Sequence, residues 1–253
     1  MDVLEIAFLL AAGFVAAAVN SVAGGGTLVS FPALLALGYP AKVANVTNTV
    51  AIWPGYASGA AAYRGEIGGQ RRRVLLLAIP SLLGAFVGAT ILLATSEDTF
   101  DAIAPFLIVF AVLLIIFQRQ LGDFAEHHKV QSQGGDHIPV ALHAGTFLTG
   151  IYGAYFGAGL GIMNLAILMI LIPDDIQHSN ALKTALSLVV NGVAAIYFAF
   201  FGPVEWVAAV ALGGGTLAGG YLGVGVARAL GPVWLKRAII VLGLTVAVAL
   251  FFR

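Results

Sequence analysis

The chain has 253 residues, of which 60% are hydrophobic and only 9% are charged, and its mean hydropathy is +0.99. Soluble domains carry roughly 25% charged residues, so this composition excludes a soluble protein and indicates an integral membrane protein. Twelve basic and twelve acidic residues cancel, which gives no support for a nucleic-acid partner, and the absence of cysteine excludes disulfides and thiolate metal sites.

The apolar stretches predict an all-α fold, a polytopic bundle of transmembrane helices. Spans of about 20 residues are needed to cross a bilayer, and the scan gives five segments in each half of the chain. Residues 119–137 are the only long polar stretch and are expected to form a cytoplasmic linker between a first repeat (1–118) and a second repeat (138–253). The expected segments are 3–23, 27–37, 41–63, 72–95 and 99–118, then 138–158, 160–172, 175–201, 204–228 and 232–252.

The two halves carry the same glycine motif. Gly24 and Gly26 match Gly159 and Gly161 at an offset of 135 residues (159 − 24). Each pair precedes the second segment of its half, which is too short to cross a bilayer as a helix. Small residues also allow close helix packing, but this placement favours broken or re-entrant helices at a midplane binding site, as in membrane carriers.

Loop charges predict that the two repeats are inverted across the membrane. Arg64 and the run 71–73 follow the third segment, whereas the matching loop of the second half carries Glu205. After the fourth segment the bias reverses, with Glu97 in the first half and Arg228 in the second. Because basic loops stay in the cytoplasm, we expect the loop after the third segment and the linker to be cytoplasmic and both termini to lie outside.

A polar stripe follows each short segment. Residues at the spacing i, i+3, i+4, i+7 and i+11 share one helix face, and such a face cannot look at lipid. For any single Asn or Thr, hydrogen bonding between packed helices and ligand binding both stay open. The stripe of the second half is Asn180, Lys183, Thr184, Ser187 and Asn191, and that of the first half is Asn45, Asn48 and Thr49.

Lys183 favours an anion site over simple helix packing. The acidic residues all fall in loops or near segment ends, so none is an obvious buried partner, although Asp174 and Asp175 lie in the nearby loop. A lysine in the bilayer costs several kcal/mol unless its charge is compensated. A bound anion compensates it, and helix N-termini exposed at the glycine breaks would add to the cradle.

Histidines give weaker signals. His178 lies two residues before Asn180 and is a candidate proton carrier, because histidine titrates near neutral pH. The linker holds His127, His128 and His137, for which exposed, solvated side chains are the commoner outcome and metal binding the rarer one. We expect no metal site and no cofactor.

Five motifs resemble those of the sulfite exporter TauE/SafE family of membrane permeases. They are residues 20–27 (Asn-Ser-Val-Ala-Gly-Gly-Gly-Thr), 31–34 (Phe-Pro-Ala-Leu) and 45–49 (Asn-Val-Thr-Asn-Thr), with echoes at 157–161 (Gly-Ala-Gly-Leu-Gly) and 180–184 (Asn-Ala-Leu-Lys-Thr). The resemblance covers essentially the whole chain. It implies secondary transport of small sulfur-containing anions, such as sulfite or organosulfonates, across the bacterial inner membrane.

The predicted substrate site combines the glycine breaks with the polar stripes. Its residues are Asn20, Ser21, Gly24, Gly25, Gly26, Asn45, Asn48, Thr49, Gly159, Gly161, Asn180, Lys183 and Thr184.

Two other functional classes compete with an alternating-access carrier. An anion channel of the same fold cannot be separated from a carrier by sequence. A membrane-embedded enzyme is disfavoured, because the chain has no His-Glu-x-x-His or Gly-x-Ser-x-Gly motif and no cysteine nucleophile. The expected partners are a small anion and the lipid bilayer, and the sequence leaves homo-oligomer formation, the coupling ion and the transport direction open.

Overall fold

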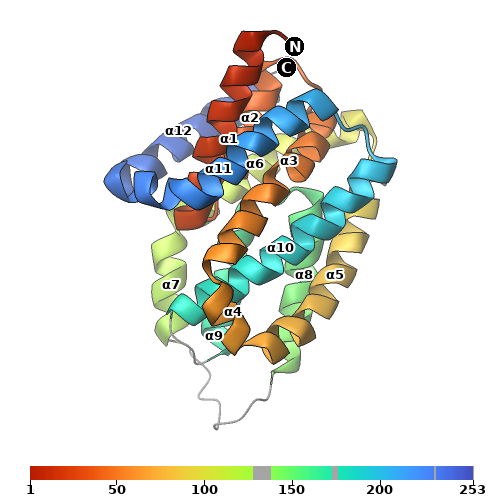
Figure 1. Cartoon of the computed structure of the whole chain (residues 1–253). Helices are drawn as coiled ribbons and strands as arrows, with labels where there is room; N and C mark the ends of the chain where they lie inside the picture. Colours follow the sequence, from red (N-terminus) through yellow and green to blue (C-terminus); the bar gives the residue numbers. More distant parts are fainter. Residues whose placement is uncertain (128–137, 173–175, 231, 253) are drawn as a thin grey trace.

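The computed structural model describes residues 1–127, 138–172, 176–230 and 232–252, and these residues form helices and no strand (Figure 1). The all-α prediction is therefore confirmed. In chain order the helices are α1 (Val3–Ala23), α2 (Thr27–Ala36), α3 (Ala41–Ala62), α4 (Arg64–Gly69), α5 (Arg71–Ala94), α6 (Glu97–Ile116), α7 (Gln118–His127), α8 (Val140–Tyr155), α9 (Leu160–Leu171), α10 (Ile176–Phe201), α11 (Trp206–Leu230) and α12 (Pro232–Phe251).

Every predicted segment corresponds to a helix whose ends lie within three residues of the expected ones. Four helices of the described part, α1, α5, α6 and α10, combine the length and the apolarity needed to cross a bilayer. This arrangement confirms a polytopic helical membrane protein. Polar caps help to start two of these helices: Asp2 accepts from the amide of Glu5 at 2.8 Å, and Ser96 accepts from the amide of Thr99 at 3.2 Å.

Two helices were not predicted. The short α4 follows α3 directly, and α7 occupies the start of the segment expected as a linker. A hydropathy scan passes over α7 because most of its residues are polar, yet Leu121 packs against the main core and the helix contacts α9. The rest of the predicted linker, 128–137, lies outside the described residues.

Two broken helical hairpins follow from the glycine motifs. Gly24 ends α1 with φ 71°, and Gly157 and Gly159 separate α8 from α9 with φ 78° and 80°. Glycine adopts this left-handed conformation without the strain that other residues incur. The helices after the breaks, α2 with 10 residues and α9 with 12, are roughly 15 Å and 18 Å long, about half of a bilayer core.

The two hairpins open toward opposite ends of the molecule. In Figure 1, α1 and α2 open at the end where both termini lie, whereas α8 and α9 open at the end that carries α4. The loop after α3 and the end of α7 therefore share one end of the bundle, and the termini share the other. That is the arrangement expected from the loop charges, while the inverted relation of the two halves itself stays a prediction.

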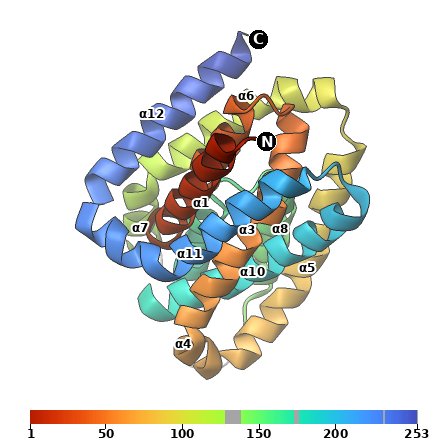
Figure 2. The ribbon, with the colours of Figure 1, turned by 45° about the horizontal axis from the view of Figure 1, so that its top comes forward.

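Helices of one half pack against helices of the other. The most extensive pairs are α1 with α11 and α8 with α5, and α3 crosses α10 near the centre (Figure 2). Glycines make the close pairs possible, because a Cβ on Gly84 or Gly88 would overlap the backbone of α8, and one on Gly215 or Gly219 would overlap the backbone of α1. The main core accordingly draws on both halves, which form one packed unit.

Candidate functional site

The two glycine breaks meet inside the molecule. A Cβ placed on Gly161 would lie 3.2 Å from the Cα of Gly24, and one on Gly24 would lie 3.2 Å from the amide nitrogen of Ile162. The backbones of the two breaks thus approach each other closely, and a Cβ on either glycine would be crowded. Residues far apart in the sequence are brought together in this way at the centre of the bundle.

A cavity of about 240 Å³ lies at this contact, and Gly161 is part of its wall. The other walls come from α1, α3, α10 and α11. At one end the lining reaches Ala62 and Tyr63, the last residues before α4, and Ala62 is exposed. The cavity therefore approaches the end of the molecule that carries α4, which is the predicted cytoplasmic end.

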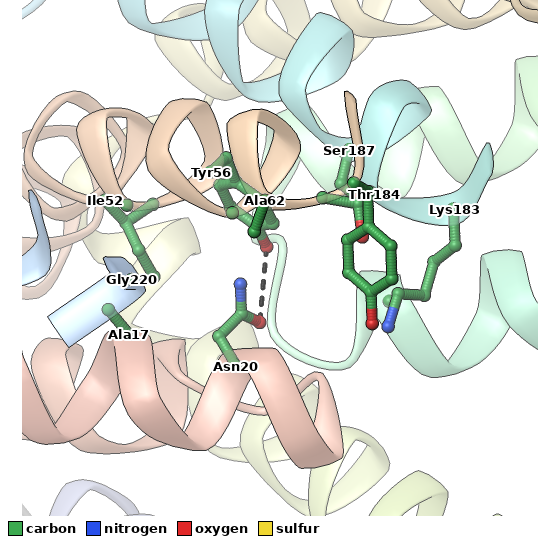
Figure 3. A pocket seen from close by; sticks show the side chains of 13 residues that line it. Ala17, Asn20, Ile52, Tyr56, Ala62, Lys183, Thr184, Ser187 and Gly220 are labelled. Carbon is green, nitrogen blue, oxygen red and sulfur yellow. Dashed lines mark hydrogen bonds between the residues drawn. The ribbon is translucent and has the colours of Figure 1, made fainter. Parts of the chain in front are cut away.

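Half of the polar side chains that line the cavity come from α10. Figure 3 shows Lys183, Thr184 and Ser187 together on one side, with Asn20 and Tyr56 between them and a more apolar end. The Tyr56 hydroxyl donates to Asn20 Oδ1 at 3.5 Å. Ser187 Oγ is buried and has no hydrogen-bond partner in the described structure. A buried hydroxyl without a partner is unfavourable.

Among the side chains that the structure describes, Lys183 is the only charged one that lines the cavity. It is 9% exposed, and its ammonium donates to Asn180 Oδ1 at 3.1 Å. Within the described residues it forms no ion pair. Asp174 and Asp175, the alternative partners, lie outside the described residues. The cavity therefore presents an ammonium with one neutral acceptor, which favours binding of an anion.

The predicted site residues fall into two groups. Four of them line the cavity: Asn20, Gly161, Lys183 and Thr184. Asn180 is adjacent, because it accepts from Lys183. The glycines of the first break, Gly24, Gly25 and Gly26, are buried, and Gly24 contacts Gly161 of the cavity wall. The side chain of Ser21 lies outside the described residues.

The first polar stripe lies away from the cavity. Asn45 donates through Nδ2 to the carbonyl of Tyr155 at 2.9 Å and so holds the end of α8, while Thr49 donates to the carbonyl of Asn45 within α3. Asn48 is buried as well. Gly159 packs against Leu114 rather than against the cavity. The role of these residues in substrate binding stays a prediction.

His178 does not line the cavity either. Its carbonyl accepts from Gln70 Nε2 at 3.0 Å, which ties the start of α10 to the start of α5. Its predicted role in proton coupling remains untested.

Some lining residues were missed by sequence reasoning. Tyr56 lies seven residues after Thr49, so the helical period would have placed it on the face of the first stripe. Ile52, Gly59 and Gly220 gave no signal, because an isoleucine or glycine in an apolar helix has an ordinary packing role. What the arrangement can do chemically is bind an anion reversibly, with hydroxyl and ammonium donors at one end of an otherwise apolar cavity.

Comparisons with known proteins identify a family and several relatives of this chain. A family model described as "Sulfite exporter TauE/SafE" matches residues 9–250. A "Probable membrane transporter protein ORF9" from Sinorhizobium sp is 28% identical over 97% of this chain and 92% of its own length. A "Probable membrane transporter protein" from Haemophilus influenzae is 26% identical, covering 96% of this chain and 92% of the relative. The "Probable membrane transporter protein YfcA" of Escherichia coli K12 is 24% identical, covering 98% and 90%. No solved structure matches the chain.

Proposed function

We propose that this chain, which belongs to the sulfite exporter TauE/SafE family, is a secondary transporter that moves small sulfur-containing anions such as sulfite or organosulfonates across the bacterial inner membrane. Its family, its relatives and its long apolar helices make it a membrane permease. The identity of the cargo, the bacterial inner membrane and the carrier mechanism go beyond these findings and are our proposal.

The single observation that carries the proposal is the setting of Lys183. An ammonium buried beside an internal cavity, with no ion pair within the described residues, is unfavourable in the empty protein. An anion in the cavity removes that penalty. Thr184, Ser187 and Tyr56 add hydroxyls to the same space, and α9 begins at Leu160 beside the cavity wall, so the positive end of its helix dipole adds to the attraction.

Packing at the opposite end of the molecule supports alternating access. There the rings of Phe31 and Phe156 meet edge to face at 5.6 Å, and Phe100 lies 6.0 Å from Tyr155. The Tyr155 hydroxyl lies 3.4 Å from Thr95 Oγ1. We call Phe31, Phe100, Tyr155 and Phe156 the aromatic cluster. A cavity that approaches one end while packed aromatic rings close the other is the state expected of a carrier that opens to one side at a time.

Two measurements on the purified full chain test the proposal. The first is a thermal-shift screen with sulfite, sulfate, organosulfonates and simple carboxylates, in which a cargo anion should raise the melting temperature by mass action. The second is flux into proteoliposomes. Uptake of labelled anion that saturates and is stimulated by unlabelled anion inside the vesicles is expected for a carrier, while flux linear in concentration would indicate a channel, and no anion binding at all would refute the proposal.

A further inference from the structure

The cavity is polar at one end and apolar at the other. In Figure 3, Lys183 and Thr184 lie at one side and Ile52, Ala17 and Gly220 at the other. Both Ile52 and Ala17 are buried, at 2% and 3% exposure, so this end of the lining is well packed. A ligand that fills this space must therefore be charged at one end and apolar at the other.

The charge of the cavity wall limits the charge of the ligand. Lys183 supplies one positive charge, and no other charged side chain of the described residues lines the cavity. A monovalent head group is neutralised by it, whereas a divalent anion would keep one uncompensated negative charge in an apolar surrounding, which is unfavourable. Sulfonates and short carboxylates stay monovalent at neutral pH, while sulfite is partly divalent there.

The size of the cavity also exceeds that of a bare oxyanion. Its volume of about 240 Å³ equals the space of roughly eight waters at about 30 Å³ each. One sulfur with its oxygens would leave the apolar end empty or filled with poorly bonded water. An attached hydrocarbon chain would displace that water and be buried among apolar side chains, which is favourable.

From these three observations we infer that the preferred ligand is a small organic monoanion, with its oxyanion head on Lys183, Thr184 and Ser187 and a short hydrocarbon tail against Ile52, Ala17 and Gly220. Ile52 is then a specificity-determining residue, because it closes the apolar end. The site recognises the charge of the head and the length of the tail, and a sulfonate and a carboxylate share that chemistry. The inference rests on the proposed binding of anions in this cavity.

A chain-length series tests the inference. Binding of methanesulfonate, ethanesulfonate, propanesulfonate, butanesulfonate and hexanesulfonate to the purified full chain would be measured by titration calorimetry beside sulfite and the carboxylates of equal length. Affinity should rise about fourfold per methylene, which corresponds to about 0.8 kcal/mol for a buried methylene, until the tail reaches Ile52, and should then fall. Equal affinities along the series, or sulfite bound more tightly than every organic anion, would overturn the inference.

Two isoleucine variants show where the tail lies. Ile52→Ala should move the best chain length up by two or three methylenes, and the milder Ile52→Val should move it up by one, which keeps the test available if the alanine variant does not fold. Ile108→Ala is the matched control, because Ile108 is fully buried in α6 outside the cavity; it should lower stability and leave the series unchanged. The same optimum in wild type and both Ile52 variants would refute the placement of the tail.

The outcomes separate this inference from the proposed function. If anions bind in a Lys183-dependent manner but tail length has no effect, only the organic tail is wrong. If neither sulfite nor any organic anion binds, the proposed transport function fails with it. Carboxylates weaker than sulfonates of equal length would assign an additional preference to the head group.

Discussion

Two lysines in this protein are equally buried, and their surroundings assign them different roles. Lys183 and Lys42 are both 9% exposed. Lys42 donates to the carbonyls of Leu93 and Thr95, where α5 ends, so it caps that helix and satisfies otherwise unpaired carbonyl groups. Lys183 instead reaches a single neutral oxygen and borders a cavity. The first arrangement stabilises the fold, and the second leaves a buried charge without an ion pair among the described residues.

Replacing Lys183 by methionine should separate binding from stability. We expect anion binding to weaken by about 1.5 to 3 kcal/mol, the range for a hydrogen bond to a charged group. The melting temperature should stay equal or rise, because an uncompensated buried charge has been removed. Titration calorimetry and thermal unfolding of the same preparations measure both effects.

Lys42→Met is the control, and it should show the reverse pattern: unchanged anion affinity with a lowered melting temperature. If Lys183→Met keeps its affinity and loses stability, the lysine is structural and the anion site lies elsewhere.

Gly59 offers a way to narrow the cavity without disturbing the fold. A Cβ at this position meets only Thr184 Cγ2, at 3.8 Å, which is ordinary van der Waals contact. We therefore expect Gly59→Val to retain the wild-type melting temperature and to reduce anion uptake into proteoliposomes at least tenfold, since the added methyl groups would occupy the space between α3 and α10. Gly65→Val in α4, where a Cβ meets nothing within 4 Å, should transport normally. Full transport by Gly59→Val would show that cargo does not pass here.

At the scale of elements, the end of α8 is held by contacts from several helices. Asn45 of α3 binds its last carbonyl, Thr95 at the end of α5 contacts the Tyr155 hydroxyl, and Phe31 of α2 packs on Phe156. These contacts pack α2, α3 and α5 against the end of α8. They are few and local, so in the proposed alternating-access mechanism removing one should shift the balance between the two access states by an amount comparable to its own energy.

Loss of the Phe31–Phe156 contact should open the closed end. The chain has no cysteine, so a single Thr184→Cys reports access to the cavity. With wild-type Phe156, a membrane-impermeant maleimide should label it only from the side that carries α4. With Phe156→Ala, labelling from the side of the termini should appear and increase several-fold. Phe110→Ala, which removes a ring packed on Tyr152 outside the aromatic cluster, should leave the labelling one-sided, and one-sided labelling of Phe156→Ala would show that the aromatic cluster is not a gate.

The sequence predicted helix positions well and contacts between helices poorly. Length and hydropathy placed all ten segments, and Gly24 and Gly159 marked the breaks because left-handed backbone needs glycine. The amphipathic α7 was missed because its polar residues resemble a linker. Lys183 and Thr184 were identified from their spacing, whereas the separation of Asn45 from the cavity depends on which helix end its amide meets. That contact is tertiary, and helical periodicity does not determine it.

At the scale of the whole molecule, the arrangement of the helix ends predicts a membrane orientation. The termini share one end of the bundle and α4 occupies the other (Figure 1), and basic residues gather around α4. A cysteine at Gly68, where a side chain meets nothing within 4 Å, should therefore be labelled from the cytoplasm only. Val3→Cys, at an exposed position, should be labelled from the periplasm only. Labelling of position 68 from the periplasmic side would overturn the inverted orientation.

The contact between Gly24 and Gly161 has a mechanical consequence. Because the two backbones touch there, we expect the hairpins of the proposed carrier to tilt about this point. A body that tilts moves most at its rim and least at its fulcrum, and Gly161 also borders the cavity. In the proposed mechanism the bound anion therefore lies where the motion of the helices is smallest. It needs to shift only slightly while the outer helices swing, so the opening can change sides with little work done on the bound anion.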